Sequence, residues 1–339
     1  MTKNQPVKHG LLPGALATGL LLLGGAALLP VAAAERTGTN LGTRSFFDGF
    51  GGAEPGCAFI AYAGHETFNS LHGPNGNKEP IPAQLDVNYL VPQATCSADM
   101  KVFGGSPGWN AIVPFSGQHS GAIVPGPANG AGLGDILTGP YIAFVPIMKE
   151  GHPVFAHSVE FDIVAPTGKY DASKNVNPGN GYWSINPFWR ATWLPAQGWE
   201  MSWRANYIHN FDHISADNHA GPGGSPVLRN GDGVWLNFAA SKEVFKDFYF
   251  GLNGYWLKQL SADVGAVPGQ QQESLHIGPG FHYTMDKFNQ VNFNVYLPVY
   301  DANALSGGYR INLQYTHPLN GSTPSGPDLH ARDARPGDG

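Results

Sequence analysis

The sequence predicts an all-β protein, a closed antiparallel transmembrane β-barrel of about 12 strands with long extracellular loops and short periplasmic turns. Three observations support this fold class. Apolar and polar residues alternate in many segments, the chain begins with a segment typical of exported proteins, and long links between predicted strands take turns with short ones. In such a barrel, lipid meets one face of every strand and a polar lumen meets the other.

The alternation is clearest in the second half of the chain. The run 291–297, VNFNVYL, changes from apolar to polar at every position. Successive side chains of a strand point to opposite faces, so this run has one apolar and one polar face. The segment 198–210 places Trp203 on its apolar face and Arg204 beside it on its polar face. An outward Trp next to an inward Arg is typical of a lipid-facing wall.

We predict about twelve strands from this pattern. They span 58–64, 84–92, 108–116, 135–148, 154–165, 182–194, 198–210, 233–243, 248–260, 273–284, 291–299 and 308–317. From the third strand onward, long links such as 211–232 alternate with short ones such as 195–197. A soluble β-sandwich also has alternating strands, but it has no reason for this rhythm of links, so the barrel is favoured.

Four regions follow from this interpretation. Residues 1–34 resemble a signal peptide, because a basic start precedes an apolar core and Ala32-Ala33-Ala34 supplies a cleavage site. The alternative, a retained membrane anchor, is weakened by the Pro and Gly residues in this segment. Residues 35–56 are Gly-rich and form either a periplasmic arm, which we favour, or a small plug in the lumen. Residues 57–320 form the barrel, and residues 321–339 form a disordered tail rich in Pro, Gly and Asp.

Composition narrows the class of protein further. Charged residues make up 13% of the chain and aromatic residues 12%, whereas soluble domains have roughly 25% charged residues. Loss of Lys3 and Lys8 with the signal peptide makes the formal net charge two units more negative than −6, which argues against a nucleic-acid partner. The two cysteines, Cys57 and Cys96, lie in an exported chain, so either a disulfide or two packed thiols fits the sequence.

Five short motifs occur in order along the chain. They are Gly132-Leu133-Gly134-Asp135, Ala165-Pro166-Thr167-Gly168-Lys169-Tyr170-Asp171, Asn177-Pro178-Gly179-Asn180-Gly181-Tyr182-Trp183, Gln259-Leu260-Ser261-Ala262-Asp263-Val264-Gly265 and Gly278-Pro279-Gly280. With these motifs, residues 45–317 resemble the family of outer-membrane transporters named for the meta-cleavage pathway of phenol degradation. The resemblance implies a β-barrel in the outer membrane and a role in the breakdown of aromatic compounds, with uptake as the expected step. It transfers no catalytic residues.

The candidate functional residues are polar side chains predicted to face the lumen. They are Glu160, Asp162, Arg190, Glu200, Arg204, His276, His282 and Arg310. We expect no catalytic residues, because neither Gly-Gly-Ser stretch continues into a nucleophile elbow. We expect no metal site and no cofactor, since His209, His213 and His219 have no compact ligand spacing.

These features predict a channel or transporter for small organic solutes, aromatic or phenolic compounds among them. The alternative is a non-conducting barrel that acts as a structural or surface-interaction protein, because mixed charges on the inner wall fit a filled lumen equally well. The expected location is the outer membrane of a Gram-negative bacterium. The expected partners are outer-membrane lipid, a small-molecule solute and, during insertion, the barrel-assembly machinery, with no nucleic acid.

Overall fold

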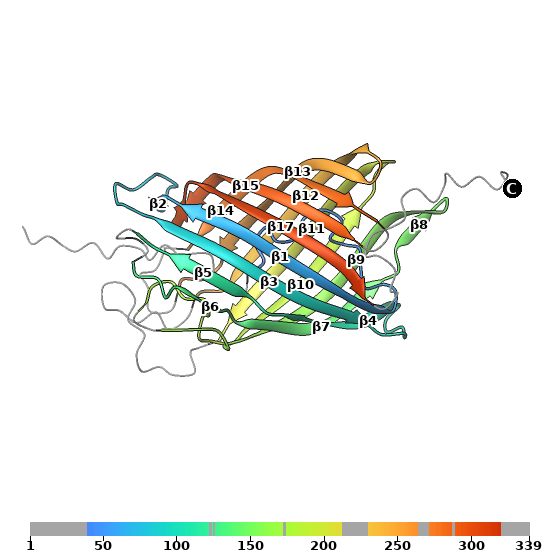
Figure 1. Ribbon diagram of the computed structural model, residues 1–339, viewed down its shortest axis with the longest axis horizontal. Helices are drawn as coiled ribbons and strands as arrows, with labels where there is room; N and C mark the ends of the chain where they lie inside the picture. Colours follow the sequence, from blue (N-terminus) through green and yellow to red (C-terminus); the bar gives the residue numbers. More distant parts are fainter. Residues whose placement is uncertain are drawn as a thin grey trace, which may run out of the picture.

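Twelve antiparallel strands form a closed ring in the computed structural model, which describes residues 39–121, 124, 126–171, 174–211, 230–263, 271–286 and 289–319 (Figure 1). The ring consists of β1 (Gly56–Phe68), β3 (Leu85–Ser97), β4 (Gly105–Ile112), β7 (Ile136–Phe144), β9 (His152–Ala165), β10 (Ser184–Trp193), β11 (Trp199–Asn210), β12 (Gly233–Phe245), β13 (Phe248–Gln259), β14 (Glu273–Thr284), β15 (Gln290–Ala302) and β17 (Tyr309–Leu319). Because β1 pairs with both β3 and β17, the sheet has no open edge. The predicted fold class is confirmed.

Short strands extend the ring at its two ends. β2 (Ser70–His72) pairs with β16 (Ala304–Ser306), and β6 (Ala131–Leu133) pairs with β5 (Phe115–His119). β8 (Ile147–Lys149) forms a hairpin with β9. Two strands predicted as continuous are interrupted in the structure, 108–116 at Pro114 and 135–148 at Pro146. Each interruption contains a proline, which has no N–H for the ladder, although Pro140 and Pro187 lie within unbroken strands.

The connections alternate in length around the ring. The links 69–84, 211–232 and 260–272 are long, whereas 194–198, 246–247 and 285–289 are short. Figure 1 shows β2, β5 and β6 at one end of the barrel and β8 at the other. The end with the long links is therefore the extracellular end, and the end with the short turns is the periplasmic one.

The barrel is polar inside and apolar outside. Phe161, Trp189 and Leu313 leave 41%, 39% and 45% of their surface exposed on the outer face, while Asn294 and Arg310 are buried inside. Phe293 is partly buried on the same outer face. Trp183, Trp193 and Trp199 are exposed near strand ends, where aromatic girdles form at membrane interfaces. A soluble sandwich would have the opposite arrangement.

Cys57 and Cys96 are joined by a disulfide in the structure. They are direct partners in the β1–β3 ladder, near its periplasmic end. The signal peptide 1–34 and the tail 321–339 lie outside the described residues. No helix in the described part of the chain is long and apolar enough to cross a membrane.

Candidate solute pathway through the barrel

Residues 39–55, here called the plug, lie inside the barrel. Leu41, Phe46, Phe47 and Phe50 are all buried, and each packs on side chains of the inner wall. In the structure these residues therefore form a small plug, the alternative to the periplasmic arm that the sequence favoured. The signal was present in the sequence, because a free arm would leave these four apolar side chains in water.

Two aromatic clusters hold the plug at its ends. Leu41 packs against Trp235, Tyr255 and Tyr296 near the extracellular end. Phe46, Phe47 and Phe50 pack against Ala156, Ala239 and Tyr249 nearer the periplasm. The rings of Phe47 and Tyr249 meet edge to face, with centroids 4.9 Å apart, a favourable geometry for an aromatic pair. Gly49 lies so close to the wall that an added Cβ would be 2.2 Å from the Thr192 nitrogen.

Polar contacts also fix the plug at the second cluster. Asp48 accepts two hydrogen bonds from the Arg204 guanidinium, at 2.8 Å from Nε and 2.7 Å from Nη2, and both side chains are buried. The backbone N–H of Phe47 donates to Glu200 Oε1 at 3.0 Å. Bidentate contacts of this kind combine strength with a fixed orientation. The plug is thus held by charge and geometry as well as by apolar packing.

Four of the eight predicted lumen residues bind other polar side chains of the inner wall. Glu160 and Asp162 both accept hydrogen bonds from the Asn110 amide, the latter at 2.8 Å. Arg190 donates to Ser158. Glu200 also accepts hydrogen bonds from Ser202 and from Ser241, the latter at 2.8 Å. All these groups are buried on the polar inner face.

The other four make the plug contact and three further sets of polar contacts. Arg204 pairs with Asp48, as described above. Arg310 donates to Glu66 Oε1, at 2.5 Å from Nη2, and to the Leu41 carbonyl. His276 lies 3.0 Å from Asp301 and 2.9 Å from the Tyr255 hydroxyl. His282 contacts Asn292 at 2.7 Å.

Sequence reasoning missed the partners of these residues. Asp48, Glu66 and Asp301 complete the buried pairs with Arg204, Arg310 and His276. Glu66 lies on β1, in step with the buried position Tyr62. Asp301 lies on β15 beyond a register shift, so the two-residue period does not identify it. Asp48 could not be found in this way, because the plug has no strand period.

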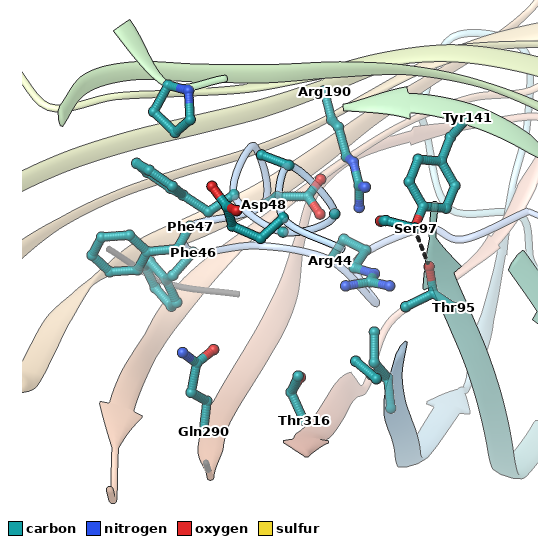
Figure 2. A pocket seen from close by; sticks show the side chains of 18 of the residues that line it. Arg44, Phe46, Phe47, Asp48, Thr95, Ser97, Tyr141, Arg190, Gln290 and Thr316 are labelled. Carbon is teal, nitrogen blue, oxygen red and sulfur yellow. Dashed lines mark hydrogen bonds between the residues drawn. The ribbon is translucent and has the colours of Figure 1, made fainter. Parts of the chain in front are cut away.

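Two cavities flank the plug within the barrel. The outer cavity, about 150 Å³, lies beside residues 39–44 and the extracellular part of the wall. The inner cavity, about 450 Å³, lies beside residues 44–58 and reaches the periplasmic turns. In Figure 2, Arg44, Asp48 and Arg190 project into the inner cavity from the plug and the wall. The lumen is therefore divided rather than uniformly filled.

The outer cavity has one apolar and one charged side. Val87, Tyr89 and Val91 of β3 form the apolar side, together with Ile112. Arg44, Glu66, Glu160, Asp162, Arg204 and Arg310 line the remainder. The contrast arises because the inner face of β3 carries Val where the facing strands carry Arg and Glu.

The sequence motifs meet at the extracellular rim rather than in the cavities. Asp135 Oδ1 accepts a hydrogen bond from the Gly168 N–H at 2.9 Å, and Oδ2 accepts one from the Asn180 N–H at 2.6 Å. A Cβ added to Gly168 or Gly179 would lie 2.7 Å from the other residue's Cα. Three motifs thus form one clamp between loops, and their glycines serve close backbone approach.

Comparison with known proteins identifies the family. The sequence profile described as "Putative MetA-pathway of phenol degradation" matches residues 68–315. The chain belongs to this family. No curated protein matches its sequence significantly.

Solved structures share the barrel. The COG4313 outer membrane channel from Pseudomonas putida F1 is 14% identical, with a TM-score of 0.69 over 80% of this chain and 98% of that one. The KdgM porin is 11% identical, with a TM-score of 0.39 over 77% of this chain and 99% of the porin. The TodX monoaromatic hydrocarbon channel is 10% identical, with a TM-score of 0.42 over 79% of this chain and 91% of that one. At these identities the similarity concerns the fold, and only the first comparison is close enough to support an argument.

No group of three or more potential metal ligands occurs within the described residues. His209 contacts Asp232 at 2.9 Å, whereas His213 and His219 lie outside the part of the chain that the structure describes.

Proposed function

We propose that this protein is a channel in the outer membrane of a Gram-negative bacterium that carries small organic solutes, aromatic or phenolic compounds in particular. The observation that supports this proposal best is the outer cavity, whose lining combines the apolar side chains of Val87, Val91 and Ile112 with Arg44 and Arg310. A phenolic solute likewise combines an apolar ring with a polar hydroxyl group. Family membership and the polar lumen agree with the proposal.

The size of the outer cavity suits one aromatic ring. Its volume is about 150 Å³, and an apolar cavity of roughly this volume binds benzene in another protein. The ring of a solute would pack on the valines of β3, while its hydroxyl or carboxylate would meet an arginine or Tyr89. Binding pockets for small molecules combine apolar walls with few polar groups in this way.

The same proposal assigns the partners. Outer-membrane lipid covers the apolar outer face, the barrel-assembly machinery inserts the chain, and a small solute occupies the lumen. The protein needs no cofactor, performs no catalysis and binds no nucleic acid in this role. The inner groups described above bind and orient rather than react.

A second candidate function is a non-conducting barrel with a structural or surface-interaction role. The plug favours it, because the Asp48–Arg204 pair and two aromatic clusters occupy the space between the walls. The inner and outer cavities argue for the channel, since a purely structural filling has no need of them.

Influx into liposomes tests the proposal. 4-Hydroxybenzoate is a suitable probe because its charge slows its passage through lipid, and glucose is a non-aromatic comparison. We expect purified protein to accelerate influx of 4-hydroxybenzoate above that of protein-free liposomes, and glucose influx much less. Absence of any acceleration would favour the non-conducting barrel.

Adjacent residues of β3 provide a matched pair of variants. Val91→Trp fills the outer cavity from the inner face, whereas Leu90→Trp adds the same ring on the exposed outer face. We expect Val91→Trp to lower 4-hydroxybenzoate influx about tenfold and Leu90→Trp to leave it unchanged. Equal influx in the two variants would show that the outer cavity is not the solute site.

A further inference from the structure

The two cavities meet at one small group of residues. Arg44, Gln93 and Glu160 line both the outer and the inner cavity. Arg44 belongs to the plug, whereas Gln93 and Glu160 belong to β3 and β9 of the wall. Any solute that passes from one cavity to the other without displacing the whole plug must pass between these side chains.

Arg44 closes this junction through a single hydrogen bond to the wall. Its Nη2 donates to Gln93 Oε1 at 2.6 Å. The same oxygen accepts a hydrogen bond from the Tyr62 hydroxyl at 3.0 Å, and the Arg44 guanidinium lies 5.2 Å from the centroid of the Tyr62 ring. Among the described residues, Gln93 is the only hydrogen-bond partner of the Arg44 side chain.

The neighbouring plug contact is an ion pair. Asp48 and Arg204 form two hydrogen bonds between opposite charges, and bidentate Arg–carboxylate pairs add fixed geometry to this attraction. Gln93 offers Arg44 only an uncharged acceptor. Arg44 also retains exposed surface, so its side chain has room to change rotamer while the plug backbone stays in place.

We propose that Arg44 is the gate between the two cavities. When its guanidinium leaves Gln93, the outer cavity opens into the inner one without movement of the plug backbone. A solute that carries a phenolic hydroxyl or a carboxylate competes with Gln93 for the Arg44 guanidinium. Binding of that polar group to Arg44 therefore opens the gate. The class of solute in this inference rests on the proposed channel function. The position of the gate rests only on the two cavities.

Single-channel conductance in planar bilayers, with potassium chloride as the only permeant, tests the gate independently of any organic solute. Arg44→Ala removes the closing side chain, and Gln93→Ala removes its partner on the wall. We expect either variant to raise conductance about threefold or more over the wild type, because the narrowest part of a pore limits its conductance.

Lys101→Ala is the control. It removes a positive charge and a contact to the Ala53 carbonyl of the plug, but Lys101 lines neither cavity. Its conductance should equal that of the wild type. Heat-modifiable migration on gels checks that every variant retains a folded barrel.

A disulfide cross-link distinguishes movement of the Arg44 side chain from movement of the whole plug. Ser45 Oγ lies 3.0 Å from Asn294 Oδ1 on β15, so Ser45→Cys with Asn294→Cys ties the plug to the wall next to Arg44. In the Arg44→Ala background, we expect the oxidised, cross-linked protein to keep the raised conductance. A return to wild-type conductance on oxidation would overturn the gate, because it would mean that the whole plug must move.

The gate and the proposed function fail in distinguishable ways. Wild-type conductance in both Arg44→Ala and Gln93→Ala, with folded barrels, refutes the gate even if 4-hydroxybenzoate still enters liposomes. Raised conductance in these variants supports the gate even if no organic solute enters, and then only the solute class is refuted.

Discussion

Replacing Asp48 by Asn should release the plug and leave the barrel intact. Asp48 is the buried carboxylate that binds Arg204 through two hydrogen bonds, at 2.8 and 2.7 Å. Asparagine keeps the shape but loses the charge, so Arg204 becomes a buried cation without its partner. Arg204 would then retain mainly the ring of Phe188, whose centroid lies 4.4 Å away.

The expected free-energy cost of Asp48→Asn follows from the burial of the Asp48–Arg204 pair. Removing one partner of a buried ion pair costs about 3–5 kcal/mol, because the other charge is left uncompensated. The strands of the barrel are held by their own ladders, so this cost falls on the docking of the plug. At about 1.4 kcal/mol per factor of ten, the undocked population should rise by roughly two to three orders of magnitude.

Limited trypsin digestion measures this population. Arg44 is the only basic residue between positions 39 and 55, and trypsin reaches its peptide bond only when the plug has left the lumen. The rate of cleavage after Arg44 tracks the undocked fraction when docking is fast, and mass spectrometry identifies the product. Asp48→Asn should be cleaved at least about a hundredfold faster than the wild type.

Two further variants complete the experiment. Asp99→Asn removes an exposed carboxylate in the turn between β3 and β4, and it should be cleaved at the wild-type rate. Arg204→Met in the Asp48→Asn background removes the stranded cation, so the double variant should be cleaved more slowly than Asp48→Asn alone. Equal cleavage of Asp48→Asn and Asp99→Asn would refute the view that this ion pair holds the plug.

Two further predictions concern the wall and the rim. Phe293→Arg places a charge against lipid and should cost roughly 2–4 kcal/mol of insertion free energy at mid-depth. Asn294→Arg should insert normally but loosen the plug at Ser45. Outer-membrane fractionation measures insertion, and equal insertion defects in the two variants would mean that the assigned faces are wrong. Asp135→Ala removes the acceptor for the Gly168 and Asn180 N–H groups, each such charge-assisted bond contributing about 1.5–3 kcal/mol. It should therefore accelerate tryptic cleavage after Lys169 and Lys174, and unchanged cleavage there would contradict a clamping role.

The barrel was predictable because its signal is local. A two-residue period specifies which face of β11 or β15 meets lipid, and every strand carries this information within itself. The inward position of Arg204 and Arg310 follows from the same period.

The plug and the pairing of the lumen charges were not predictable in the same way. Asp48 meets Arg204 across 156 positions, and Leu41 meets Arg310 across 269. No periodicity connects such residues, and the Gly-rich composition of 35–56 suggested an arm. The apolar side chains of Leu41 and three phenylalanines were the available signal, but they identify a buried segment without saying where it is buried.

The order of the chain constrains the order of assembly. The plug precedes β1, yet its partners Arg204, Asn237 and Asn294 lie on β11, β12 and β15, which emerge much later from the ribosome and the export machinery. The plug therefore cannot complete its contacts until β15 has joined the sheet. A barrel that closed without a docked plug would have a wider lumen in the outer membrane.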